Sequence, residues 1–266
     1  MKVVLFCGGL GTRLREHSET IPKPLVNIGH QPMLWYLMKY YAHFGHTDFI
    51  ICLGYRGDLI KDFFLNYDPR HSRDFLLSGG KTAYDSTTSD VADWNIRFVD
   101  TGLHSNIGMR LRAVRPFLEG EPMFLANYSD QLSDLPLDDY LTRFERSGAT
   151  AGFVAVRPSQ SYHVATIAEG GNVLGIQAIG QEDFWINGGF LALRQEIFDY
   201  LEEGEDLVEE PFQRLIKAGQ LYSYKYTGFW RCMDTFKDKI IFDRMWGRRA
   251  EPWKVWSSSS GDAGRD

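Results

Sequence analysis

The chain has 266 residues and a formal net charge of −6 at pH 7, with 44% hydrophobic and 14% aromatic residues. This apolar content is enough for one large α/β domain, with or without a small appendage. The acidic balance excludes a broad basic surface of the kind that recruits nucleic acid, so an anionic ligand must be met by backbone N–H groups, a few cations or a metal ion. No apolar stretch approaches the ~20 residues of a membrane span.

The first elements alternate between strand and helix. A continuous apolar run from Val3 to Cys7 predicts a strand buried on both faces, and a glycine-rich, charged loop follows from Gly8 to about Gly29. Pro32 opens a helical pattern through Phe44. A second buried strand from Phe49 to Leu53 and a helix from Asp58 to Tyr67 come next. This order predicts a parallel sheet with right-handed crossovers.

The remaining elements follow a polar excursion at residues 68–93, where we expect a flap. Beyond it the patterns predict strands at 95–99, 123–126, 150–156 and 221–226, and helices near 110–117, 137–147, 195–203, 208–218 and 235–247. Residues 162–193 hold two short alternating segments, joined by a hairpin signal at Glu169-Gly170-Gly171-Asn172. We expect a single domain over residues 1–256 and a disordered, serine-rich tail over 257–266.

The three cysteines indicate a reducing compartment. Cys7, Cys52 and Cys232 form no C-x-x-C pair, and Cys7 and Cys52 lie in apolar runs, where cysteine is ordinarily a small buried thiol. The segment before Cys7 runs directly into glycines and is too short for a signal peptide. We therefore expect a cytoplasmic protein that has neither nucleic acid nor a membrane as its partner.

A glycine loop directly follows the first strand. Gly8, Gly9 and Gly11 let backbone N–H groups approach an anion closely, and Thr12 and Arg13 come next, the arginine adding a positive charge. Two familiar phosphate motifs are excluded. A P-loop requires G-K-[ST], which is missing, and a dinucleotide fingerprint requires an acidic residue where the second strand here ends in Leu53-Gly54.

The loop continues to a lysine framed by prolines. Lys23 lies ten residues after Arg13, in Ile21-Pro22-Lys23-Pro24-Leu25. Flanking prolines keep such a segment extended and stiff, so that the ammonium group is aimed at one place. Together the glycine loop and Lys23 predict a clamp for a triphosphate.

The glycine loop at residues 8–14 and the Pro-Lys-Pro-Leu segment at residues 22–25 resemble the N-terminal signature of the sugar-phosphate nucleotidyltransferases. Further landmarks narrow the resemblance to the glucose-1-phosphate cytidylyltransferase family and cover residues 1–256 in order. They are Cys52-Leu53-Gly54-Tyr55-Arg56-Gly57, Val99-Asp100-Thr101-Gly102, Ile186-Asn187-Gly188-Gly189-Phe190, Gly228-Phe229-Trp230, Met233-Asp234-Thr235 and Pro252-Trp253-Lys254-Val255-Trp256. The resemblance implies a Rossmann-like, doubly wound mixed sheet, with a small β appendage from residues 157–190 on the acceptor side.

The resemblance also implies a reaction, the transfer of CMP from CTP to a sugar 1-phosphate or a sugar-like phosphate. Transfer between two polyanions needs charge neutralisation more than a base, and Mg²⁺ suits that task because it binds one or two carboxylates together with substrate phosphates. Asp130 follows the predicted strand at 123–126, and Asp234 precedes the last predicted helix. Both match the family's magnesium-holding aspartates. The preference for cytosine as the base rests on the resemblance alone. We also expect the chain to form a homo-oligomer.

The implied site residues fall into three groups. Arg13, Lys23 and Asp130 would be catalytic. The residues that would bind the nucleotide are Leu5, Gly8, Gly9, Gly11, Thr12, Arg13, Lys23, Thr101, Arg110, Ser129 and Asp130. Those that would bind the acceptor are Tyr128, His163, Ala178, Ile179, Asn187 and Gly188. The family's Y-G-D-G pattern reads Tyr128-Ser129-Asp130-Gln131 here, so both of its glycines are replaced.

The acceptor side departs further from the family pattern. Relatives carry a Glu-Lys-Pro motif whose Glu grips sugar hydroxyls and whose Lys meets the sugar phosphate, whereas Ala178 and Ile179 occupy this place here. Three hypotheses follow. The acceptor phosphate is held by other groups, with His163, Arg157 and Arg194 as candidates; the acceptor is a different phosphate, such as that of a cyclitol or a heptose; or the chain binds nucleotides without turnover.

Overall fold

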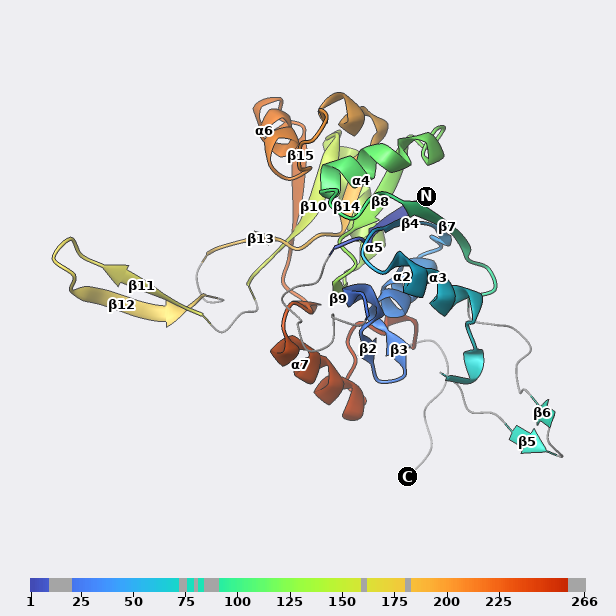
Figure 1. The fold of residues 1–266 in the computed structure, drawn as a ribbon. Coiled ribbons are helices and arrows are strands. Elements are labelled where there is room, and N and C mark those ends of the chain that lie inside the picture. Colours follow the sequence, from blue (N-terminus) through green and yellow to red (C-terminus); the bar gives the residue numbers. More distant parts are fainter. Residues whose placement is uncertain are drawn as a thin grey trace.

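The first strand, β1 (Val3–Phe6), lies inside an eight-stranded mixed sheet. The computed structural model describes residues 1–9, 21–71, 76–78, 81–83, 91–158, 162–179 and 183–257. The strand order is β13-β10-β14-β8-β1-β4-β7, with β15 paired to β10 (Figure 1). The bounds of the other seven strands are Asp48–Leu53 for β4, Asn95–Asp100 for β7, Met123–Asn127 for β8, Ala151–Val156 for β10, Ile186–Asn187 for β13, Leu191–Arg194 for β14 and Leu221–Tyr226 for β15.

One half of the sheet is parallel. Strands β7, β4, β1 and β8 run in the same direction, as the alternating pattern of strands and helices predicts. Their carboxyl ends therefore meet at one edge, which is where open α/β sheets bind ligands. Strand β14 is antiparallel to β8 and β10, and β10 is parallel to β15, so the sheet as a whole is mixed.

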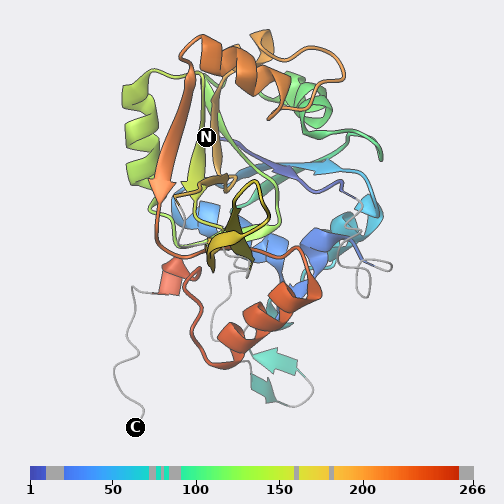
Figure 2. The same cartoon turned by 90° about the vertical axis from the view of Figure 1, so that its left-hand side faces the viewer.

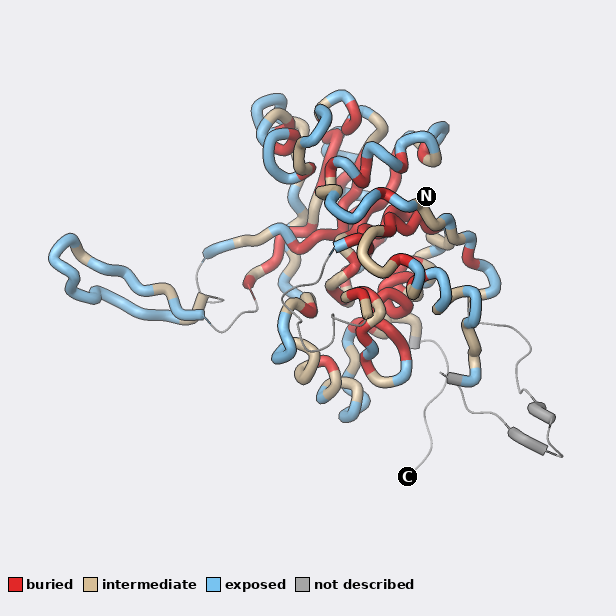
Figure 3. Tube along the Cα trace, in the orientation of Figure 1, coloured by how far each residue is buried: buried red, intermediate tan, exposed pale blue. Residues whose placement is uncertain are grey.

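Helices cover both faces of the sheet, which confirms the doubly wound arrangement. Alternate residues of β1 point to opposite faces, so Val3 and Leu5 belong to one apolar cluster and Val4 and Phe6 to another. The first cluster receives α2 (Met33–His43), α3 (Gly57–Leu65), α5 (Leu137–Ser147) and α7 (Phe236–Gly247). The second receives α4 (Ile107–Val114) and α6 (Glu210–Lys217). Figure 2 shows α6 and α7 on opposite sides of the sheet, and Figure 3 shows the buried strands between the layers.

The predicted β appendage is a hairpin that projects from the globule. Strands β11 (His163–Ile167) and β12 (Val173–Ala178) pair with each other and with no other strand of the described chain. Figures 1 and 3 show this hairpin extending away from the sheet with most of its residues exposed. The turn lies at Glu169-Gly170-Gly171-Asn172, with Gly171 in the left-handed region at φ +82°, as the hairpin signal predicts.

Smaller elements complete the chain. The described parts of the excursion at 68–93 include a 3₁₀ helix and a short hairpin, while the disordered tail predicted for 257–266 lies outside the described residues except for Ser257. The small pairs are β2 (Asn27–Ile28) with β3 (Gln31–Pro32), β5 (Leu76–Ser78) with β6 (Lys81–Ala83), and β9 (Gln131–Ser133) with β16 (Trp230–Cys232). The 3₁₀ helices are η2 (Lys23–Leu25), η3 (Pro69–His71), η4 (Arg115–Phe117), η6 (Gln195–Asp199) and η7 (Val255–Ser257).

Two predicted helices differ from the structure. The helix expected near 195–203 is the short η6, because the carbonyl groups of Tyr200 and Leu201 accept hydrogen bonds from Arg214 and Arg112 instead of from a continuing helix. The helix expected near 110–117 begins earlier, at Ile107, where the Asn106 side chain accepts the Met109 N–H and caps it. Within the described residues, no helix is long and apolar enough to cross a membrane.

Candidate active site

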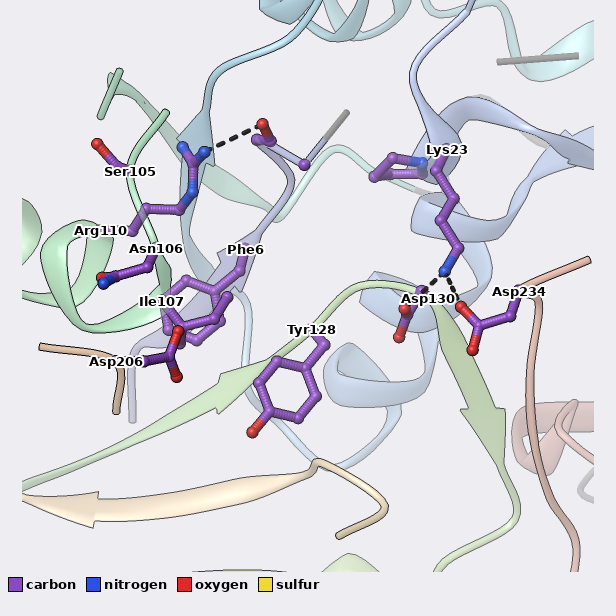
Figure 4. Close-up of a pocket in the computed structure, with 13 residues that line it drawn as sticks. Phe6, Lys23, Ser105, Asn106, Ile107, Arg110, Tyr128, Asp130, Asp206 and Asp234 are labelled. Atoms are coloured by element: carbon purple, nitrogen blue, oxygen red, sulfur yellow. Dashed lines mark hydrogen bonds and ion pairs between the residues drawn. The ribbon is translucent and has the colours of Figure 1, made fainter. Parts of the chain in front are cut away.

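A cavity of about 450 Å³ lies at the carboxyl edge of the parallel strands (Figure 4). Polar, charged and aromatic groups converge on it from the glycine loop, the lysine loop, the ends of β1 and β8, the start of α4 and the segment before α7. The lining residues are Phe6, Gly8, Gly9, Lys23, Pro24, Ser105, Asn106, Ile107, Arg110, Tyr128, Asp130, Asp206 and Asp234.

Lys23 bridges the two predicted carboxylates. Its Nζ lies 2.7 Å from Asp130 Oδ2 and 2.6 Å from Asp234 Oδ1, and all three side chains are no more than one-quarter exposed (Figure 4). Burial lowers the pKa of Lys23, but the charge of Asp130 and the hydrogen bonds to both carboxylates outweigh that effect, so the pKa lies above its usual value. The lysine therefore stays charged at neutral pH.

Two strands that are distant in sequence place Asp130 beside Asp234. Strand β9 begins directly after Asp130, and its partner β16 ends at Cys232. The Met233 N–H donates to the Asp130 carbonyl oxygen at 2.8 Å, which closes the gap between the two aspartates. Thr235 then starts α7 with a capping box, in which Asp238 accepts from the Asp234 and Thr235 backbone N–H groups. Asp234 is thus fixed between a strand end and a helix cap.

Asp130 and Asp234 are also the candidate metal ligands. Among the described residues, no group of three or more His, Cys, Asp and Glu side chains is arranged to hold an ion. Two carboxylates nevertheless match the demand of Mg²⁺ when substrate phosphates and water supply its other ligands. Both already contact the Lys23 ammonium group, so the donor set fits a magnesium ion shared with a substrate.

A buried arginine, Arg110, donates hydrogen bonds to the start of the glycine loop and to the neighbouring strand ends. The Arg110 guanidinium, 3% exposed, donates to Gly8 O at 3.0 Å, Leu53 O at 3.0 Å and Thr101 Oγ1 at 2.7 Å. A Cβ on Gly8 would lie 2.0 Å from Arg110 Nη1, so only glycine leaves room for this contact. Burial lowers the pKa of Arg110. The structure brings Arg110 and Thr101 together beneath the loop, where they position it.

The departures from Y-G-D-G are accommodated by specific contacts. Ser129 is buried at φ +65°, a conformation in which glycine is the usual residue, and its N–H donates to Asn127 Oδ1 at 2.9 Å. Gln131 points away from the cavity, and its Nε2 donates to Gly188 O at 3.1 Å. A Cβ on Gly189 would lie 1.8 Å from that nitrogen, so the glutamine packs into the space that this glycine leaves.

Only part of the predicted acceptor group converges on the cavity. Tyr128 lines it, its pKa raised by burial, and its hydroxyl accepts from Asn187 Nδ2 at 3.0 Å. Gly188 is held by Gln131 and by Trp230 Nε1 at 2.8 Å. The other predicted residues, His163, Ala178 and Ile179, lie at the base of the projecting hairpin and do not line the cavity.

The two arginine candidates for an acceptor phosphate are far apart. Arg194 pairs with Met123 at the start of β8, the end of the strand opposite Asp130, so it cannot reach a phosphate held there. Arg157 lies at the end of β10 near the hairpin, forms an ion pair with Asp183 at 3.3 Å and stacks 5.0 Å above the Trp185 ring. Of the two, Arg157 is nearer the acceptor side.

Some of the predicted nucleotide-binding residues do not line the cavity. Leu5 is fully buried between β4 and β8 and is not among the residues that line the cavity, and its contact with the nucleotide stays a prediction. Gly11, Thr12 and Arg13, which were predicted to bind the nucleotide, lie outside the described residues. The sequence reasoning missed six lining residues: Phe6, Pro24, Ser105, Asn106, Ile107 and Asp206. A helix-capping signal was available at Asn106, but nothing in the polar run around Asp206 marks it.

Comparison with known proteins agrees with this geometry. The profile of the Nucleotidyl transferase family matches residues 2–240. The chain belongs to this family. A probable glucose-1-phosphate cytidylyltransferase of Bacillus subtilis is 34% identical over 264 residues, covering 96% of this chain and 100% of that protein. The glucose-1-phosphate cytidylyltransferase of Salmonella typhi is 36% identical over 258 residues, with 96% and 100% covered.

This nucleotidyltransferase also shares its fold with solved structures. A putative glucose-1-phosphate thymidylyltransferase from Bacillus anthracis superposes with a TM-score of 0.65 at 16% identity, over 98% of this chain and 97% of that one. At that identity the likeness shows the fold alone, which confirms the predicted Rossmann-like architecture. The sequence relatives add that the chain is an enzyme of the sugar-phosphate nucleotidyltransferase class.

Proposed function

We propose that this enzyme transfers CMP from CTP to a sugar 1-phosphate or a sugar-like phosphate, giving a CDP-linked product and pyrophosphate. The observation that carries the proposal is the contact of Lys23 with both Asp130 and Asp234. These three residues lie at one end of a cavity that Gly8 and Gly9 of the glycine loop also line. Two relatives with matching length carry the name glucose-1-phosphate cytidylyltransferase, which supports cytosine as the base and a sugar 1-phosphate as the acceptor.

The reaction requires in-line attack at the α-phosphorus of CTP. An acceptor phosphate oxygen forms a bond to that phosphorus, and the bond to the bridging oxygen breaks, so pyrophosphate leaves with the electron pair. Gly8 and Gly9, together with Gly11, Thr12 and Arg13, cradle the triphosphate through backbone and side-chain donors. Lys23 stabilises the growing negative charge. Mg²⁺ held by Asp130 and Asp234 would neutralise phosphate charge, and no covalent enzyme intermediate is needed.

A test of this proposal separates an enzyme from a nucleotide-binding relative without turnover. Pyrophosphate release is measured with CTP, UTP, ATP, GTP and dTTP, each with and without a panel of sugar, heptose and cyclitol phosphates. The proposal expects release with CTP that depends on an acceptor. Binding of CTP without release under any acceptor would support the non-catalytic alternative instead.

Glucose 1-phosphate is expected to be a poor acceptor, because Ala178 and Ile179 replace the family's Glu and Lys. A lysine–phosphate contact in a shielded site contributes roughly 1.5–3 kcal/mol, so its loss weakens binding about ten- to a hundredfold. The physiological acceptor would then be bulkier, less polar or phosphorylated differently. Steady-state kinetics with CTP check this, and kcat/KM of about 10⁴ M⁻¹s⁻¹ or above with glucose 1-phosphate would contradict it.

The projecting hairpin supports a homo-oligomer. Four large apolar side chains of β11 and β12 are at least 60% exposed: Ile167, Val173, Leu174 and Ile176. A two-stranded hairpin is only marginally stable in water, and its two strands contain no Lys, Arg, Asp or Glu, which suits contact with a second copy of the same acidic chain. Light scattering after gel filtration should give a mass above 30.5 kDa for the unaltered chain. Ile176→Asp should lower that mass, and Thr166→Asp on the opposite face should not; a monomeric unaltered chain would contradict the assembly.

The proposal also includes a cytoplasmic location and a magnesium cofactor. Cys7 and Cys52 are buried free thiols and Cys232 is a half-buried one, which suits the reducing cytoplasm. Burial raises the pKa of Cys7 and of Cys232 to about 12, so neither is a reactive thiolate at neutral pH. We assign Mg²⁺ as the cofactor on the strength of the two convergent carboxylates.

A further inference from the structure

A third carboxylate lines the cavity, at the end away from the lysine. Asp206 lies with Ile107 and Asn106 near the start of α4, whereas Lys23, Asp130 and Asp234 lie together at the other end (Figure 4). It comes from the segment between η6 and α6, and neither the phosphate loop nor the metal pair involves it. The carboxylate influences Tyr128 across the cavity, since its charge contributes to the raised pKa of that phenol.

The segment that carries Asp206 is fixed by contacts with its neighbours. Asn106 Nδ2 donates to Gly204 O at 2.9 Å, and a Cβ on Gly108 would lie 2.2 Å from Glu205 O, so this segment packs directly on α4. Arg214 donates to Tyr200 O at 2.7 Å and pairs with Glu205. These contacts on both sides hold Asp206 in the cavity wall.

The negative charge of Asp206 is unfavourable in a triphosphate site unless the ligand places a hydrogen-bond donor next to it. Its side chain accepts the Val208 backbone N–H at 3.3 Å, and in the part of the chain that the structure describes no lysine or arginine forms an ion pair with it. A carboxylate opposes bound phosphate, but it is well matched to a neutral donor. Lys23 and the two candidate metal ligands, which would meet the phosphates, lie at the other end of the cavity. A triphosphate held there leaves the nucleoside as the part of CTP to be placed at Asp206.

We infer that Asp206 selects the base by accepting a hydrogen bond from the exocyclic amine of cytosine. Carboxylates accept from this amine in base recognition, whereas uracil and thymine present a carbonyl oxygen at the same position and would be repelled. Phe6, Tyr128 and Ile107 line the same part of the cavity and offer flat and apolar surfaces suited to a base ring. This inference rests on the proposed use of CTP.

The test compares nucleotides in the full-length enzyme. We expect kcat/KM for CTP over that for UTP to fall about ten- to a hundredfold in Asp206→Asn, because the amide can donate to the uracil carbonyl oxygen. The ratio of CTP to 2′-deoxy-CTP should stay unchanged. Glu203→Gln, an exposed acidic residue of the same segment that does not line the cavity, is the matched control and should leave both ratios as they are.

The outcomes separate the inference from the proposed function. An unchanged ratio of CTP to UTP overturns the role of Asp206, and a change confined to the 2′-deoxy ratio overturns it in favour of a ribose contact. A wild-type enzyme that prefers UTP also overturns it. Absence of wild-type turnover with CTP refutes the proposed function itself. Asp206→Ser, assayed beside thermal melting of both variants, keeps the comparison decisive if the asparagine variant folds poorly.

Discussion

Replacing Lys23 with alanine is expected to lower kcat/KM by about a hundredfold or more, the scale on which loss of one transition-state donor acts. Lys23 Nζ contacts both Asp130 and Asp234, so its loss removes a cation shared by two partly buried carboxylates. It also leaves the incoming triphosphate without its clamp. The effect should appear in kcat as well as in KM, because the charge on the transferring phosphate grows during the reaction. Pyrophosphate release under single-turnover and steady-state conditions measures both.

The control for this variant is Lys217→Ala, which removes an exposed lysine at the end of α6. It should change kcat/KM less than twofold or so, since isolated surface charges contribute little. If Lys23→Ala is folded by thermal melting and turns over at the wild-type rate, the clamp assigned to Lys23 is wrong.

The second large effect concerns the two aspartates as one unit. Asp130→Asn and Asp234→Asn should each reduce kcat/KM by roughly a hundredfold or more, because charge neutralisation by a bound metal contributes several kcal/mol. The double variant should be no worse than either single one, since either loss already empties the shared site. A double-mutant cycle at several Mg²⁺ concentrations measures this coupling.

An ion pair outside the cavity provides a control for the double-mutant cycle of Asp130 and Asp234. Lys239 and Asp243 form an ion pair at 2.5 Å on the surface of α7. Asp243→Asn should have a small effect that simply adds to that of Asp130→Asn. Additive losses for Asp130 and Asp234 would mean that the two carboxylates do not hold one ion, and the metal assignment would fail.

The elements that periodicity predicts best are those whose own side chains meet the core. Helix α5 has the predicted bounds, because Leu137, Tyr140, Leu141 and Phe144 recur at helical spacing and Gly148 ends the helix at φ +67°. Strand β1 is predictable for the same reason, since all four of its residues are buried. In both cases the local pattern and the tertiary environment agree.

The site is less predictable because it depends on contacts between distant segments. Lys23, Asp130 and Asp234 are all predicted from motifs, but the pairing of β9 with β16 is what places Asp234 beside Asp130. Asp206 carries no sequence signal, since it lies in a polar segment whose position depends on Arg214, Asn106 and the absence of a side chain at Gly108. The prediction for Arg194 is wrong for the same reason. Its positive charge made it a candidate for the acceptor phosphate, but the residue lies at the opposite end of the sheet from Asp130.

Transfer of the CTP α-phosphorus to an acceptor phosphate can be followed with labelled CTP. CTP radiolabelled at the α-phosphorus is incubated with the enzyme, Mg²⁺ and each candidate acceptor phosphate, and the products are separated. We expect the label in a CDP-linked product, only when acceptor is present and in an amount equal to the pyrophosphate released. Label found in free CMP independently of any acceptor, or retained in CTP throughout, would contradict it.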